Sequence, residues 1–185
     1  MTSPAARIDA IYRYPVKGLS PQKLERAALA AGRTIAADRL YAIENGPTGF
    51  DPAAPSYFPK IRFLMLMRNE RLAGLKTDYD EASHTLSIGH EGREAARGDL
   101  RTREGRLAIE AFLRHFMPNE LNGPPKVLSG EAPSGVPHSF SDVAKKSRLH
   151  HQSRLGRRGR GRRRPAGRPL AFSRQYLCQR LAGLA

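Results

Sequence analysis

The sequence lacks several features that define large classes of protein. It has a single cysteine, Cys178, and no tryptophan. One cysteine excludes an intrachain disulfide and any metal site built from paired cysteines. No apolar run approaches the roughly 20 residues of a membrane-spanning helix, and the opening residues MTSPAARIDA lack the apolar core of a signal peptide. We therefore expect a cytoplasmic protein that neither forms disulfides nor contacts a membrane.

Acidic residues are absent from the last fifth of the chain. Residues 147–185 contain eleven arginines and no lysine, aspartate or glutamate, so they supply +11 of the formal net charge of +15. Residues 1–146 are only mildly basic. The arginine-rich segment has too few apolar side chains to offset the entropy of ordering it, and we expect it to be disordered. A basic tail of this kind is also typical of nucleic-acid or acidic-lipid binding.

Common catalytic and nucleotide-binding motifs are missing as well. The sequence contains no GxGxxG, GxxxxGK[ST] or GxSxG pattern, so dinucleotide-binding, P-loop and α/β-hydrolase interpretations have no support. The histidines are too scattered to indicate a metal site. We predict no catalytic residue and no metal ligand from these motifs.

The hydrophobic pattern predicts a β-rich α+β fold. Strands are expected within residues 7–16, 38–45, 61–67 and 84–90. Residues 23–34 are compatible with a short helix or a strand, and the family resemblance described below favours the strand. A helix is expected to begin after Asn69, and a stronger one over residues 102–117, with Thr102 as its cap. The apolar face of this second helix is expected to contain Leu107, Ala108, Ala111, Phe112 and Phe116. Residues 45–60 are predicted to form a long loop and residues 119–138 a linker.

Two short motifs place cations at strand ends. In YPVKG, residues 14–18, Lys17 lies on a tight turn beside exposed backbone N–H groups, which suits a phosphate. In DRLY, residues 38–41, Asp38 can orient the guanidinium of Arg39, and arginine forks onto phosphate oxygens. Both cations are also compatible with solvated surface charges, the more common role of such residues.

Five segments together carry a family resemblance. IYRYPVKGLS, DRLYAIENG, FDPAAPSYFPK, FLMLMRNERLAGL and HSFSDVAKK occur in an order and spacing that resembles the MOSC (molybdenum cofactor sulfurase C-terminal) family. The similarity covers about residues 7–146. It implies a small N-terminal β-barrel-like domain with one or two helices over residues 5–130, followed over residues 131–146 by a linker and the start of a truncated MOSC domain.

The resemblance also implies a set of binding residues. In the family, a lysine and an arginine contact the phosphate and pterin of the molybdenum cofactor, and these correspond to Lys17 and Arg39. Ser141 and Asp142 match a cofactor-side element at the start of the second domain. Many relatives have serine where this chain has Gly18, so one hydroxyl contact would be missing. Pyridoxal phosphate belongs to a separate module of the sulfurase and is not expected here.

Residues 147–185 depart from the family pattern, and we interpret them as a frameshift product. Family members continue into a strand such as SIINLAS and later an RFRxNI element. Codons allowed for residues 150–153, read one nucleotide later, permit Ile-Ile-Asn-Leu. The same shift within residues 167–185 permits Arg-Phe-Arg-Ala-Asn-Ile. Cys178 lies in this segment and is therefore not assigned as a metal ligand. Resequencing the gene tests this interpretation. If its codons, read one base later, do not encode these elements, the interpretation is wrong.

Three functional hypotheses follow. The intact family fold would bind molybdenum cofactor and either reduce N-hydroxylated compounds, with electrons from a separate redox partner, or transfer sulfur. Because most of the catalytic domain is missing, this chain is expected to be inactive. Alternatively, the β-barrel domain is a binding module without chemistry. The third hypothesis is nucleic-acid binding through the basic tail, although no specific nucleic acid is expected.

Overall fold

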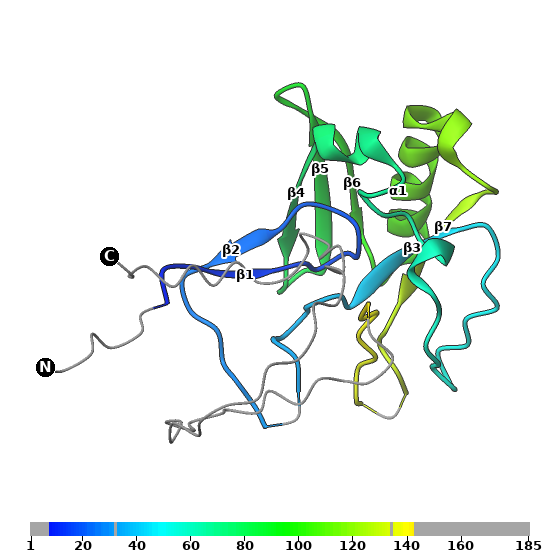
Figure 1. Ribbon diagram of the computed structural model, residues 1–185. Coiled ribbons are helices and arrows are strands. Elements are labelled where there is room, and N and C mark those ends of the chain that lie inside the picture. Colours follow the sequence, from blue (N-terminus) through cyan, green and yellow to red (C-terminus); the bar gives the residue numbers. More distant parts are fainter. Residues whose placement is uncertain (1–7, 32, 134, 143–185) are drawn as a thin grey trace, which may run out of the picture.

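Seven strands and one α-helix make up the folded part of the chain. The computed structural model describes residues 8–31, 33–133 and 135–142. The strands are β1 (Ile11–Arg13), β2 (Gln22–Leu24), β3 (Tyr41–Asn45), β4 (Leu75–Asp80), β5 (Thr85–His90), β6 (Arg93–Asp99) and β7 (Pro125–Ser129), and the helix is α1 (Arg103–Phe116). Three single-turn 3-10 helices, η1 (Lys60–Arg62), η2 (Glu70–Gly74) and η3 (Pro118–Glu120), connect them. The predicted β-rich fold with few helices is confirmed (Figure 1).

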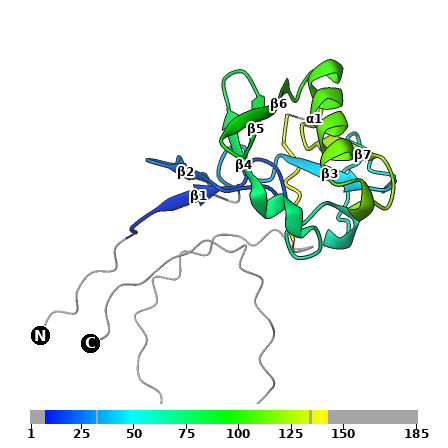
Figure 2. The ribbon, with the colours of Figure 1, turned by 90° about the horizontal axis from the view of Figure 1, so that it is seen from above.

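The strands form three small antiparallel sheets. β1 pairs with β2, β3 with β7, and β4–β5–β6 form the third sheet in sequence order. α1 packs against both β6 and β7 and so links the third sheet to the β3–β7 pair (Figure 2). The β-barrel-like domain expected from the sequence is therefore built from three separate strand ladders over the described residues.

β3 lies between two hydrophobic cores. Every residue of β3 is buried. Tyr41 and Ile43 belong to the larger core, whereas Ala42 belongs to a smaller core with Phe63, Leu128 and Phe140. Side chains alternate between the two faces of a strand, so one five-residue strand supplies both cores. This central position makes β3 the element against which the candidate site is assembled.

The segment after Asn69 differs from its predicted helix. Only the 3-10 turn η2 forms, and residues 75–80 continue as β4. The Asn69 side chain makes no cap hydrogen bond; it accepts from the backbone N–H of Met65 at 3.2 Å and donates to the Glu120 carbonyl at 3.3 Å. Leu75 and Tyr79 then alternate with exposed residues, a period-2 pattern that favours a strand.

Residues 61–67 and 119–138 were also predicted wrongly. The first segment is not a strand; η1 leads into a single bridge between Phe63 and Glu44. The Leu64 N–H donates to the Ile43 carbonyl at 2.8 Å, after which the chain turns at Arg68. The second segment is not only a linker, because it contains β7, which pairs along the whole of β3. Of the strand expected within residues 23–34, only β2 forms, one residue earlier.

α1 has the predicted bounds, but only part of the predicted face is correct: Phe112 and Phe116 pack against the larger core, whereas Ala108 and Ala111 are exposed. The Thr102 hydroxyl accepts from the Gly105 N–H at 3.0 Å, as expected of a cap. The buried residues are Ile109, Glu110 and Leu113, whereas Leu107 is exposed. The Glu110 carboxylate accepts from the Val127 N–H at 2.8 Å. A buried acid therefore fixes the helix to β7, which hydrophobic periodicity alone does not indicate.

Two buried tyrosines meet a histidine beside β3. The hydroxyls of Tyr41 and Tyr79 lie 3.0 and 3.1 Å from His84 Nδ1, and their rings are 5.9 Å apart. His84 Nδ1 also lies 3.4 Å from a Glu131 carboxylate oxygen. Burial raises the pKa of both tyrosines above the ordinary value, because a phenolate is poorly solvated there.

We expect these tyrosines to make the protein sensitive to alkaline unfolding. Above about pH 10 the unfolded chain loses tyrosine protons that the folded chain keeps, so stability falls by about 1.4 kcal/mol per pH unit for each tyrosine. Burial lowers the pKa of Lys17. Below the pKa of lysine in the unfolded chain, this lysine therefore makes the free energy of unfolding rise with pH, opposite to the effect of the tyrosines. Urea unfolding between pH 9 and 11.5 measures the combined effect of the tyrosines and Lys17 on the free energy of unfolding. Tyr41→Phe should flatten the slope, whereas Tyr57→Phe, at an exposed position, should leave it unchanged; equal slopes in all three proteins would contradict the assignment.

Candidate functional site

The turn carrying Lys17 is fixed to the start of β3 by backbone hydrogen bonds. The Lys17 N–H donates to the Tyr41 carbonyl at 2.8 Å, and the Tyr41 N–H donates to the Pro15 carbonyl at 3.0 Å. Val16 forms a parallel bridge with Tyr41. The turn after β1 is therefore a rigid part of the core, and the Lys17 side chain starts from a defined position.

Gly18 is required by the shape of this turn. Its φ is +84°, and a Cβ built on it would lie 2.3 Å from the Leu64 carbonyl oxygen. A side chain at this position would both adopt an unfavourable backbone conformation and overlap another backbone segment. A serine at position 18, the residue that the family resemblance leads us to expect, would not fit this turn as it stands.

Lys17 is a buried cation paired with the other end of the described chain. Its side chain is only 3% exposed, and Nζ lies 2.6 Å from Asp142 Oδ1. Nζ also donates to the Phe140 carbonyl at 3.0 Å and lies 5.4 Å from the centre of the Phe63 ring. Burial lowers the pKa of Lys17, and the neighbouring Asp142 opposes that shift. The expected solvated surface lysine is thus a core residue.

Arg39 is held by Asp38, the pairing expected from the DRLY motif. The guanidinium donates to Asp38 Oδ2 at 2.6 Å and lies 5.2 Å from the centre of the Tyr14 ring. Asp38 Oδ1 accepts from the Tyr14 N–H at 2.9 Å. Arg39 has a φ of +52°, so the chain reverses here before β3. The carboxylate therefore fixes both the arginine and the strand end that precedes the Lys17 turn.

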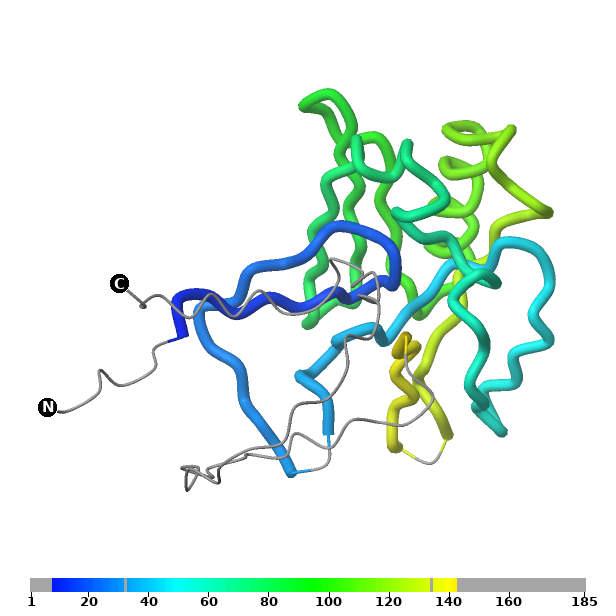
Figure 3. Tube along the Cα trace, viewed as in Figure 1, coloured from blue at the N-terminus to red at the C-terminus, as the bar shows by residue number. Residues whose placement is uncertain are grey.

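Residues 136–142 return to this region after β7 (Figure 3). The Phe140 N–H donates to the Arg39 carbonyl at 2.9 Å, and the His138 N–H donates to the Gly130 carbonyl at 2.7 Å. The Ser139 hydroxyl donates to the Asp38 carbonyl at 3.1 Å. We call residues 136–142 the return segment. It is held along one side of the DRLY turn and brings Ser141 and Asp142 to the predicted site.

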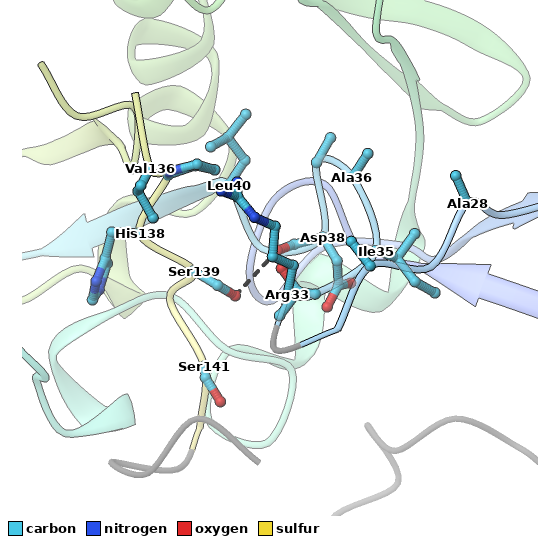
Figure 4. A pocket seen from close by; sticks show the side chains of 14 residues that line it. Ala28, Arg33, Ile35, Ala36, Asp38, Leu40, Val136, His138, Ser139 and Ser141 are labelled. Carbon is cyan, nitrogen blue, oxygen red and sulfur yellow. Dashed lines mark hydrogen bonds between the residues drawn. The ribbon is translucent and has the colours of Figure 1, made fainter. Parts of the chain in front are cut away.

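A cavity of about 370 Å³ lies between the return segment and residues 28–40. Its walls are mostly small and apolar, with alanines at positions 28, 30, 36 and 37. Polar groups come from Asp38, Ser139 and Ser141, among others, and Figure 4 shows them together on the side where the two segments meet. The cavity has room for a small-molecule group. Ser141 lines it together with Arg33, whereas Lys17, Arg39 and Asp142 do not.

The four residues predicted from the sequence lie in one region of the fold. Lys17 and Asp142 are in direct contact, Arg39 is bonded to the return segment through its backbone, and Ser141 lines the cavity. Sequence reasoning missed Ser139 and the Phe140 carbonyl, although both lie in the quoted HSFSD stretch. It also missed Lys60, which lies near enough to lower the pKa of Lys17 further.

The described residues show no metal centre and no membrane span. Within residues 8–31, 33–133 and 135–142, no group of three or more His, Cys, Asp or Glu side chains could hold a metal ion. Across the same part of the chain, no helix has the length and apolar character to cross a bilayer. The arginine-rich residues 147–185 and Cys178 lie outside the described residues, so the frameshift interpretation stays a prediction.

Comparison with known proteins identifies the first part of the chain. Residues 5–116 match the MOSC N-terminal beta barrel domain, while no curated protein and no solved structure matches the chain. The matched region includes Lys17 and Arg39 and ends at the last residue of α1, before β7 and the return segment. The match covers more than half of the 185 residues, and the chain therefore belongs to the family of the MOSC N-terminal beta barrel domain.

Proposed function

We propose that this chain contributes the phosphate-binding part of a molybdenum cofactor site. MOSC proteins are generally associated with that cofactor. Lys17 and Arg39 would hold its phosphate, Ser141 would add a hydroxyl, and Asp142 would help to position the pterin. The observation that carries the proposal is the meeting of Lys17 with Asp142, whose side chains are 125 residues apart in sequence and 2.6 Å apart in the fold.

The chemical types of the hydrogen-bond donors in the site suit a phosphate. The Lys17 ammonium and the Arg39 guanidinium lie on segments bonded to the return segment, whose Ser139 and Ser141 line the cavity of about 370 Å³. Phosphate oxygens accept strong charge-assisted hydrogen bonds from such groups, and a guanidinium can bind two oxygens at once. Both cations already have a carboxylate partner, so a bound phosphate would have to share or replace that partner.

The chemistry of such a site would come mainly from the cofactor. When bound, its molybdenum would supply the redox centre for reducing N-hydroxylated compounds or for transferring sulfur. The residues described here bind and orient, and none of them is a cysteine that could ligate the metal. A separate redox partner, a cytoplasmic location and the expected inactivity of this chain remain predictions. A binding domain without chemistry is the alternative.

We expect cofactor loading to depend on Lys17. The full chain would be produced in a host that makes molybdenum cofactor, and its molybdenum would be measured by mass spectrometry and its pterin by fluorescence after oxidative release. Lys17→Met should lower both by about tenfold or more, since a hydrogen bond to a charged group contributes about 1.5–3 kcal/mol. Lys23→Met, at an exposed position in β2, is the matched control.

Two results would contradict this proposal. One is a purified chain that contains neither molybdenum nor pterin under conditions in which another molybdenum protein from the same host is loaded. The other is equal loading of the Lys17→Met and Lys23→Met proteins. Thermal unfolding of each variant must be measured alongside, so that a loss of loading can be separated from a loss of fold.

A further inference from the structure

Both oxygens that accept hydrogen bonds from the Lys17 ammonium lie in the same segment of the chain. An ammonium has three donors, and both oxygens that accept from Lys17, Asp142 Oδ1 and the Phe140 carbonyl, belong to the return segment. Apart from these two bonds, the ammonium lies 5.4 Å from the centre of the Phe63 ring. The buried charge of Lys17 is therefore neutralised by the Asp142 carboxylate of the return segment, and another anion can take the place of that carboxylate.

The two carboxylates of the site are held very differently. Asp38 accepts from the Tyr14 N–H and from Arg39, and its backbone carbonyl accepts from Ser139. Among the described residues, the Asp142 carboxylate is hydrogen-bonded only to Lys17, and its side chain remains 16% exposed. The Asp142 backbone carbonyl accepts a long hydrogen bond from the Tyr57 hydroxyl at 3.5 Å. Releasing Asp142 therefore breaks a single side-chain contact and returns the carboxylate to water, whereas releasing Asp38 would dismantle the turn.

Positive charge around Lys17 exceeds what one carboxylate neutralises. Arg39 and Lys60 both lie close enough to lower the pKa of Lys17. Arg39 is paired with Asp38, which leaves Asp142 as the anion facing Lys17. A phosphate carries more negative charge and more acceptor oxygens than a carboxylate. It would therefore interact more strongly than Asp142 with this group of cations.

We propose that Asp142 is an internal anion that competes with a phosphate group for Lys17. Phosphate binding displaces the Asp142 carboxylate, while Phe140 stays in place because its side chain is buried in the smaller core and its N–H is bonded to Arg39. Ion-pair exchange at Lys17 thus couples phosphate binding to the release of the Asp142 carboxylate, which is then available to the pterin. The phosphate position follows the proposed function, but the competition rests on the contacts of Lys17 and Asp142.

The competition can be tested with inorganic pyrophosphate as the probe. Calorimetry on the full chain at low salt should show that Asp142→Asn binds pyrophosphate about tenfold more tightly than the unmodified chain, because the competing charge is gone. The arginines of residues 147–185 contribute the same background in every variant. Asp9→Asn, at an exposed position, changes the charge equally and should leave the affinity unchanged.

A second variant links the gain in affinity to Lys17. In the double variant Lys17→Met, Asp142→Asn the tenfold gain should disappear, and a gain that persists would overturn the proposal. Equal affinity of the Asp142→Asn and unmodified chains would also overturn it.

Hydrogen exchange on the unmodified chain provides a test that needs no variant. Saturating pyrophosphate should speed exchange at the amides of Ser141 and Asp142 and leave that of Phe140 protected. Unchanged exchange at all three amides would contradict the displacement. A chain that passes these tests yet takes up no molybdenum would disprove the proposed cofactor, and one that binds molybdenum but fails them would disprove only the competition.

Discussion

Replacing Gly18 by serine is expected to lower the free energy of unfolding by about 3 kcal/mol or more. The substitution adds a positive-φ penalty of about 1 kcal/mol and places a Cβ 2.3 Å from the Leu64 carbonyl oxygen. Relief of that overlap requires the Lys17 turn to move away from β3.

Gly49→Ser separates the two causes of this loss. Gly49 has a φ of +75°, close to that of Gly18, but a Cβ there would meet nothing within 4 Å. We expect a loss of about 1 kcal/mol for Gly49→Ser, which isolates the backbone penalty. Chemical denaturation of the three proteins measures the difference. If the two variants lose the same free energy of unfolding, the overlap with the Leu64 carbonyl does not contribute to the loss.

Replacing Gly130 by alanine is expected to detach the return segment. A Cβ at Gly130 would lie 1.9 Å from the His138 carbonyl oxygen and 2.9 Å from the Leu40 carbonyl oxygen. Three backbone segments meet here, and none can yield without losing a hydrogen bond to its neighbour. We expect a loss of about 3 kcal/mol, with Phe140 leaving the smaller core.

Limited proteolysis and thermal unfolding together test this second prediction. The Gly130→Ala protein should be cleaved within residues 131–142 at protease concentrations that leave the unmodified chain intact there, and its midpoint of unfolding should fall. Gly74→Ala is the control, because that glycine has no positive φ and a Cβ there would meet nothing within 4 Å. Cleavage at equal rates in both variants would contradict the packing of the return segment.

Local sequence signals predicted those elements that depend on local interactions. α1 was predicted closely because Thr102, the helical spacing and Pro118 all act within the helix or next to it. The strand at residues 85–90 was found for a similar reason, since its alternation is regular. The side of α1 that faces the core was predicted only in part. Phe112 and Phe116 pack against the core as expected, whereas Glu110 is buried by its bond to Val127, a partner outside the helix.

Tertiary partners determined the elements that sequence reasoning missed. Within the apolar run at residues 61–67, only residues 63–65 are buried, and they form no strand ladder. The Leu64 N–H donates one hydrogen bond to the Ile43 carbonyl of β3, and the chain then turns. β7 was interpreted as part of a linker because Pro124 precedes it and Pro125 is its first residue, yet β3 supplies its whole partner strand. For the site, the residue types came from the family pattern, while the burial of Lys17 and its pairing with Asp142 depend on the fold.

The pairing of β3 with β7 has a consequence for synthesis of the chain. The paired residues are 80 to 88 positions apart in sequence, so at about 5–20 residues per second β3 waits roughly 4–18 s for its partner to be translated. During that interval an apolar strand has neither its ladder nor its two cores. We expect the nascent chain to need a chaperone over this period, and a ribosome paused before residue 125 should hold a species that the chaperone still binds.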